Sequence, residues 1–107
     1  MGRRVRKKTY KKWREAVVER DKVCVVCGKP PPYLNAHHLI PSLFSQYQYD
    51  VENGIALCPQ CHTLGKWSAH KNPVWFTNWL RTNKGYLLLQ ISQRLQELEE
   101  LEDEKEV

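Results

Sequence analysis

Residues 53–62 read NGIALCPQCH, and they combine a short apolar run, a pair of cysteines and a histidine. The run GIAL (54–57) is a candidate strand that leads directly into the cysteines. Cys58 and the proline after it predict a helix start, because proline suits the first helical position. Gly65 should end this helix after a few residues. We therefore expect a strand, a turn with two thiols, and a short helix that carries His62.

A second C-x2-C pair, CVVC at 24–27, lies 30 residues before CPQC at 58–61. Each pair turns two thiolates toward one ion, and two pairs complete a tetrahedral shell. Gly28 follows the first pair, where a positive φ is often needed. A redox C-x-x-C motif and two disulfides are the alternatives, but a redox motif does not explain two pairs. We expect a closed, structural Zn²⁺ site with four ligands: Cys24, Cys27, Cys58 and Cys61.

Residues 35–41 read NAHHLIP and place two histidines side by side. The residues around them predict a short strand that stops at Pro41, after a proline-rich loop at 29–35 and before a loop at 42–52. Adjacent strand residues face opposite sides, but this alternation relaxes near a strand end. The cysteine frame brings the pair close to the second C-x2-C unit. One imidazole could then hold a metal with His62 while the other contacts a water molecule.

Charge is unevenly distributed over the 107 residues, whose formal net charge is +5. Residues 1–20 hold nine Lys or Arg against two Glu, residues 21–90 six against three acids, and residues 91–107 two against seven acids. A basic start followed by a mildly basic middle is typical of a nucleic-acid-binding protein, although a solvated, disordered tail has the same composition. We see no signal peptide and no run that could span a bilayer, and we expect a soluble, cytoplasmic protein in a reducing compartment.

Three helices are predicted outside the cysteine region. Residues 9–20 carry an apolar stripe with Thr9 as N-cap, and residues 74–83 follow an Asn-Pro start and should stop at Lys84, with Gly85 at C′. The bulky face of residues 74–83 is expected to be core and not a base-stacking platform. Residues 86–104 form a last helix with a narrow leucine seam, suited to packing or to a dimer contact.

The segments CVVC, AHHLIP and ENGIALCPQCH together closely resemble the HNH endonucleases of the ββα-metal class, in their zinc-knuckle form. The resemblance covers about residues 13–66. It implies an α+β fold: a ββα-metal finger stapled by the four-cysteine zinc site, with flanking N-terminal and C-terminal helices. We expect a basic N-terminal arm at 1–8, an HNH nuclease domain at 9–85, and a C-terminal helix with an acidic tail at 86–107.

The resemblance also implies residue roles. His38 matches the general base, and Asn53 matches the asparagine that orients it. His37 and His62 match the ligands of one catalytic divalent ion, commonly Mg²⁺ or Mn²⁺. The chemistry agrees, because an imidazole is a suitable base near neutral pH and a divalent cation supplies Lewis acidity to the phosphate and the leaving oxygen.

The sequence departs from some family members at Lys66, where they have another metal-binding histidine. We expect two protein ligands on the ion and a phosphate contact from Lys66. His70 could be a third ligand, but a lone histidine beyond Gly65 is expected to be an ordinary surface residue. The expected DNA-contacting residues are Arg3, Arg4, Arg6, Lys7, Lys8, Lys11, Lys12, Arg14 and Lys66.

The sequence therefore predicts a metal-dependent DNA endonuclease that nicks or cleaves duplex DNA. By resemblance, small free-standing members are often phage-encoded and assist genome packaging beside a terminase, which would place the protein in the host cytoplasm. A homodimer through the C-terminal helix is a further expectation. Two alternatives stay open: a non-catalytic zinc-finger DNA-binding module, with structural histidines, and a protein-interaction domain that uses the leucine seam and the acidic tail.

Overall fold

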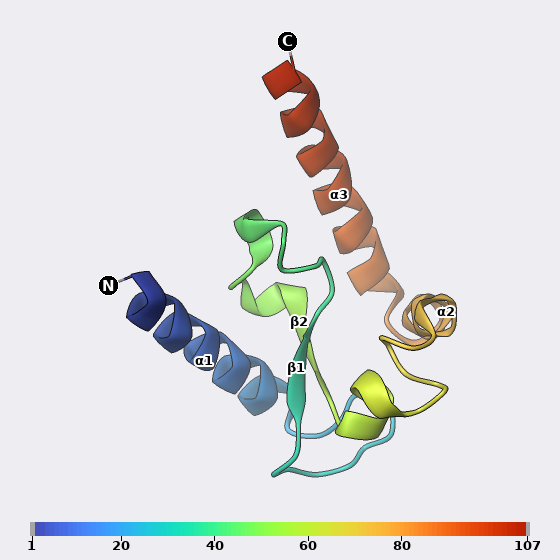
Figure 1. Cartoon of the computed structure of the whole chain (residues 1–107). Coiled ribbons are helices and arrows are strands. Elements are labelled where there is room, and N and C mark those ends of the chain that lie inside the picture. Colours follow the sequence, from blue (N-terminus) through green and yellow to red (C-terminus); the bar gives the residue numbers. More distant parts are fainter. Residues whose placement is uncertain (1, 107) are drawn as a thin grey trace.

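The computed structural model describes the backbone of residues 2–106 and the side chains of residues 9–102. Over these residues a two-stranded sheet lies between α1 on one side and α2 and α3 on the other (Figure 1). The elements in chain order are α1 Gly2–Asp21, β1 Asn35–His38, the 3-10 turns η1 Ser45–Tyr47 and η2 Val51–Asn53, β2 Gly54–Leu57, the short helix η3 Gln60–Leu64, α2 Pro73–Asn83 and α3 Gly85–Glu106. The order strand, strand, short helix confirms the α+β class and the ββα finger with helices on both sides of it.

Helix α1 begins at Gly2, so the prediction that a helix starts with Thr9 as its N-cap is wrong. Residues 3–8 are mostly Arg and Lys, which are good helix formers, and no glycine or proline separates them from the apolar stripe. The predicted basic arm is thus helical from Gly2 onward, and its side chains, at residues 1–8, lie outside the described part. Trp13 and Val17 from the stripe are buried, whereas Tyr10 is 43% exposed.

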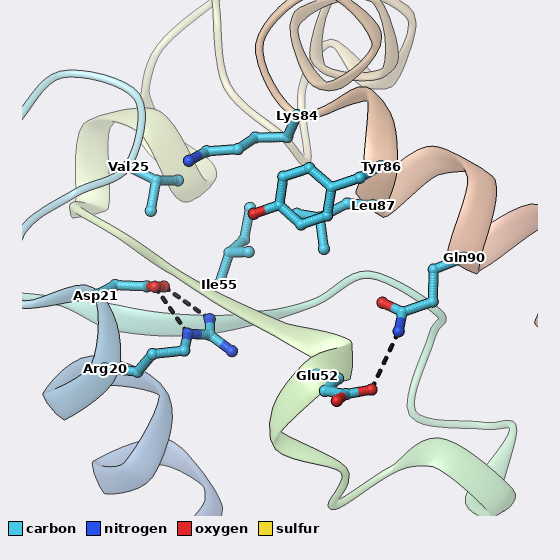
Figure 2. A pocket seen from close by; sticks show the side chains of 9 residues that line it. All are labelled: Arg20, Asp21, Val25, Glu52, Ile55, Lys84, Tyr86, Leu87 and Gln90. Carbon is cyan, nitrogen blue, oxygen red and sulfur yellow. Dashed lines mark hydrogen bonds and ion pairs between the residues drawn. The ribbon is translucent and has the colours of Figure 1, made fainter.

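The last turn of α1 covers the free edge of β2. Arg20 donates to the carbonyl oxygens of Val51 and Gly54, at 2.9 and 2.6 Å. Asp21 accepts from the backbone N–H of Ala56 at 2.9 Å, and its carboxylate also binds the Arg20 guanidinium (Figure 2). These contacts satisfy backbone groups that an edge strand would otherwise leave open. They fix where α1 ends relative to the sheet.

The two strands are antiparallel, with His38 opposite Gly54. The prediction of a strand at GIAL is confirmed by β2, whose four residues are all buried. The predicted strand that reaches Pro41 is too long, because β1 ends at His38. Beyond it the backbone turns toward η2, and the N–H of Leu39 donates to the carbonyl of Asn53 at 3.0 Å. This turn replaces regular pairing at the end of the strand that carries the two histidines.

The C-x2-C segments adopt the predicted local structure. Gly28 has a φ of 79°, a conformation that glycine adopts without a steric penalty. The short helix η3 carries His62 and ends at Gly65, whose N–H donates to the carbonyl of Gln60 at 2.9 Å. Pro59 has helical backbone angles, φ −54° and ψ −37°, and begins this helical segment as the sequence predicted. Residues 42–52, predicted as a loop, contain the tight turns η1 and η2.

The C-terminal part consists of α2 and α3. The predicted cap of α2 is confirmed, because the Asn72 side chain accepts from the N–H of Trp75 at 3.1 Å. Phe76 and Leu80 are buried in the core, so the bulky face of α2 is core as predicted. The prediction for Gly85 is wrong, because its φ is not positive and α3 begins there. None of the described helices is long and apolar enough to cross a membrane.

Candidate active site and metal centres

The four cysteines form one cluster at the end of the finger. Each offers a sulfur atom, and all four sulfurs lie within 4.8 Å of one another. The sulfurs of Cys27 and Cys58, from different C-x2-C pairs, are 3.6 Å apart. Thiolates about 2.3 Å from a tetrahedral Zn²⁺ lie roughly 3.8 Å from one another. The cluster therefore fits a four-thiolate zinc site without a further ligand.

The environment of the thiols also suits a cation. Burial raises the pKa of Cys58, but hydrogen bonds from the Cys61 backbone and from the Cys27 thiol outweigh it and bring the pKa to about 7. Burial raises the pKa of Cys27 and of Cys61. A metal ion that replaces the thiol protons stabilises thiolates that burial disfavours.

Three histidines form a second cluster, on β1, η3 and the loop that follows η3. The rings of His37, His62 and His70 each offer a nitrogen, and these nitrogens lie within 4.8 Å of one another. The Nε2 atoms of His62 and His70 are 3.1 Å apart. Two nitrogen ligands of one small cation lie at about this separation, given metal–nitrogen bonds of roughly 2.0–2.1 Å. The three imidazoles therefore fit a single divalent cation.

Burial favours the neutral form of His37 and of His62 by lowering their pKa values. Burial, followed by the neighbouring charges of His62 and His70, lowers the pKa of His37 to about 3. Burial, then His70, also lowers the pKa of His62. A neutral imidazole has a free lone pair, which is the form that binds a metal.

The structure places His70 in the histidine cluster, although the sequence predicts an ordinary surface residue. It is exposed, but its ring lies against the rings of His37 and His62, at 5.0 and 4.6 Å between centroids. The loop after Gly65 folds back on η3, because the N–H of His70 donates to the carbonyl of His62 at 3.0 Å. His70, four residues after Lys66, thereby lies within reach of the other two histidines. Only the path of this loop reveals that, since a lone histidine gives no local signal.

The two adjacent histidines do share a cleft. His37 and His38 both line a cavity of about 310 Å³, together with His62, His70, Tyr10, Ala36, Pro41 and Ser42. His37 lies in the three-histidine cluster, and His38 lies on the other side of the strand, against α1. One cavity therefore reaches both rings at the end of the strand.

His38 is held by backbone and by an indole. Its Nε2 lies 2.8 Å from the carbonyl oxygen of Gln48. Because a carbonyl can only accept, Nε2 carries the proton and Nδ1 has the free lone pair in the neutral ring. The ring also stacks on Trp13, with centroids 4.0 Å apart and planes 10° from parallel. The sequence predicts neither contact, because neither Gln48 nor Trp13 lies near His38 in the chain.

Asn53 lies in the core and is 1% exposed. Its side-chain oxygen accepts from the N–H of Ile40 at 2.8 Å, and its amide donates to the carbonyl oxygens of Ile40 and Tyr47, at 3.0 and 3.2 Å. It therefore contacts the backbone two residues after His38 and one residue before Gln48, not the imidazole itself. Its geometry suits a residue that fixes the segment around the predicted base.

The residues predicted to contact DNA lie on the surface wherever their side chains are described. Lys11, Lys12, Arg14 and Lys66 are exposed. Lys11 pairs with Glu15 one helical turn later, at 3.9 Å. The side chains of Arg3, Arg4, Arg6, Lys7 and Lys8 lie outside the described residues.

Another cavity, of about 250 Å³, lies between the end of α1, β2 and the start of α3 (Figure 2). Its charged lining groups already serve the fold. Arg20 and Asp21 bind each other and the edge of β2, and Glu52 accepts from Gln90 at 3.0 Å. This cavity is part of the contact of α3 with the finger, and the histidine cavity is the better candidate site.

Comparison with known proteins agrees with this geometry. The family model described as HNH endonuclease matches residues 24–65. A protein named Anaredoxin from Nostoc sp. (strain PCC 7120 / SAG 25.82 / UTEX 2576) is 44% identical over 41 residues, which cover 37% of this chain and 51% of that protein. The chain thus spans about half the length of this curated relative, and no solved structure matches. The matched segment contains both C-x2-C pairs, His37, His38, Asn53 and His62. Residues 24–65 therefore match an HNH endonuclease domain, and the four cysteines fit the form whose finger is held by two C-x2-C pairs.

Proposed function

We propose that this protein is a divalent-metal-dependent endonuclease that hydrolyses phosphodiester bonds in DNA, with His38 as the general base. One observation carries the proposal: a histidine with its Nε2 proton committed to a carbonyl lies in the same cavity as three imidazoles whose spacing fits a cation. A base and a cation site side by side are what hydrolysis of a phosphodiester requires.

In this mechanism Nδ1 of His38 accepts the proton of the attacking water. The hydrogen bond from Nε2 to Gln48 keeps the neutral ring in the tautomer that leaves Nδ1 basic. This bond also stabilises the imidazolium once the proton has been accepted. Asn53 holds the backbone that carries both partners.

His37, His62 and His70 would hold the catalytic cation. When bound, it supplies Lewis acidity to the phosphate and to the leaving oxygen. Among the described residues this cluster contains no carboxylate. Imidazole ligands favour first-row transition ions over Mg²⁺, whose preferred ligands are oxygens. Of the two ions that the resemblance implies, we therefore propose Mn²⁺, and we expect Mg²⁺ to support less activity.

The substrate is proposed to be DNA because the HNH family implies it and because α1 is strongly basic. Exposed Lys12 and Arg14 project from the helix that also contributes Tyr10 to the cavity. Contacts of this kind bind phosphates without reading sequence, so binding should weaken steeply with salt. By resemblance the products carry 3′-hydroxyl and 5′-phosphate ends. A homodimer through α3, and a phage packaging partner such as a terminase, stay predictions of the sequence.

The test is nicking of supercoiled plasmid by the Zn²⁺-loaded protein with Mn²⁺, Mg²⁺ or Ni²⁺, scored for nicked and linear products. The decisive variant is His38→Gln, because the glutamine amide can still donate to the Gln48 carbonyl but has no basic nitrogen. We expect a loss of about 10²- to 10⁴-fold in rate with DNA affinity unchanged. The matched control is Arg81→Ala, on the exposed face of α2, which should retain the wild-type rate. Binding without cleavage in every cation would instead favour the zinc-finger DNA-binding module.

A further inference from the structure

The general base is contacted from outside the segment that matches the family. Trp13 lies on α1, eleven residues before that segment begins at Cys24, and it is 2% exposed. Its indole covers one face of the His38 ring, at 4.0 Å between centroids and 10° between planes. A nearly parallel contact at this distance limits tilting of the imidazole.

The same indole also holds the partner of the imidazole. Its Nε1–H donates to the carbonyl of Asp50 at 2.7 Å. Asp50 lies two residues after Gln48, whose carbonyl accepts from Nε2 of His38 at 2.8 Å. One side chain thus fixes the plane of the imidazole and the backbone segment to which its proton is committed. A tryptophan can make both contacts because it combines a large flat ring with one N–H donor.

Gly54 leaves space on the sheet for the indole ring of Trp13. Gly54 lies opposite His38 in the register, and a Cβ atom at that position would lie 2.6 Å from Cζ2 of Trp13 and 2.7 Å from Cγ2 of Val17. Distances this short would displace the indole. The missing side chain at Gly54 therefore lets α1 approach the sheet closely enough for Trp13 to reach the histidine.

We propose that Trp13 is a positioning residue for the hydrolysis, which holds His38 in the tautomer and the ring plane needed to accept a proton at Nδ1. This inference rests on the proposed function, since it assigns a role toward the same base. A purely structural core residue would require only the apolar volume of the indole. The parallel stack on His38 and the hydrogen bond to Asp50 go beyond filling volume, and they orient the imidazole and the segment that binds it.

The test compares three substitutions in the full-length Zn²⁺-loaded protein. Trp13→Phe keeps an aromatic ring but removes the N–H donor, and Trp13→Leu also removes the stack. Val17→Ala is the matched control, because Val17 is buried on the same face of α1. For each variant, kcat and KM for plasmid nicking are measured at saturating Mn²⁺ and corrected for the folded fraction.

We expect kcat to fall roughly 10-fold for Trp13→Phe and roughly 100-fold for Trp13→Leu, with KM changed less than about twofold, since small displacements of a catalytic group have effects of this size. Val17→Ala should keep the wild-type kcat after the correction. Equal corrected losses in Val17→Ala and the Trp13 variants, or no loss in the Trp13 variants, would overturn the proposal.

A second readout does not require activity. In ¹⁵N-resolved NMR spectra the neutral ring of His38 should be the Nε2–H tautomer in the wild type and a mixture of tautomers in Trp13→Leu. If Trp13→Leu does not fold, a benzothienyl analogue placed at position 13 keeps the stack and the volume but lacks the N–H. We expect it to fold with the wild-type melting temperature and to show the kcat of Trp13→Phe. Unchanged tautomers and an unchanged kcat in that variant contradict the positioning role. If the wild type nicks no DNA but the His38 tautomers still differ between the wild type and Trp13→Leu, the proposed nuclease function is wrong and the positioning role of Trp13 stands.

Discussion

The finger holds two clusters of potential metal ligands that differ in what surrounds them. The cysteine cluster has four sulfur donors, three of them buried, and it joins the two ends of the matched segment. The histidine cluster has three imidazoles and lines a cavity of about 310 Å³. A four-donor shell leaves no position for a substrate, whereas a three-donor shell beside a cavity does. The number of donors and access to the cavity thus separate a cluster that holds the fold from one that suits chemistry.

The largest effect that tests this difference is expected for Cys58→Ser. Structural Zn²⁺ sites contribute apparent binding free energies of about 10–16 kcal/mol to small folds, far more than a domain of this size has in reserve. The variant should lose its cooperative thermal transition and its stoichiometric zinc, measured by circular dichroism and by metal analysis. His70→Ala, treated identically, should keep both. A normal melting transition in Cys58→Ser would mean that the cysteine cluster is not structural.

The second-largest effect is expected for Asn53→Ala, which tests whether Asn53 stabilises the backbone around His38 independently of the cysteine cluster. The change leaves the N–H of Ile40 and two carbonyl oxygens without their partner in a buried region, at a cost of roughly 1–3 kcal/mol for each group left unpaired. We expect a lower melting temperature, measured calorimetrically, and a turnover that falls more than the affinity for DNA. Asn53→Asp keeps the acceptor and should lose less stability. An unchanged rate would remove Asn53 from the orientation of His38.

A smaller effect is expected for His70→Ala, which tests whether the histidine cluster has two or three ligands. Loss of one of three imidazoles should weaken Mn²⁺ binding roughly 10- to 100-fold, measured by titration calorimetry without DNA. Excess Mn²⁺ should then restore much of the nicking rate, because His38 is untouched. Lys66→Ala is the comparison at the position that the family suggested, and its cation affinity should stay at the wild-type value. Equal Mn²⁺ affinities in the wild type, His70→Ala and Lys66→Ala would mean that His70 is not a ligand.

The smallest effect is expected for Arg94→Met, which tests whether α3 helps to hold the segment that contains Gln48. Arg94 pairs with Asp50 and Glu52, at 3.2 and 2.9 Å, and lies over the ring of Tyr47 at 5.0 Å. It thereby holds the segment that supplies the Gln48 carbonyl. Arg94→Met should cost about 1 kcal/mol or less in stability, since its partners are partly exposed, and it should lower kcat only a few-fold. The matched control is Arg81→Met on α2. Identical kcat values for both variants would show that α3 does not influence the base.

Some of the site could be predicted because its signals are local. Local sequence determines the two C-x2-C pairs, the turn at Gly28, the helix end at Gly65 and the helix cap at Asn72. The structure has each of these features where the sequence predicts it. The start of α1 was not predicted, because helix-forming Arg and Lys residues continue the helix without a cap signal. Gly85 shows the converse case, since a glycine that suits a helix end here begins the next helix.

The sequence alone determined the chemistry available to this protein, since the order of thiols, adjacent imidazoles and a carboxamide already predicts one closed metal site and a second, open one. Only the tertiary structure decided which groups meet. His70 joins the cluster because a loop folds back, and His38 is oriented by a carbonyl ten residues away and by an indole on another helix. The physical reason is that ligand types and turns depend on the local chain, whereas contacts of this kind depend on packing between segments distant in the sequence.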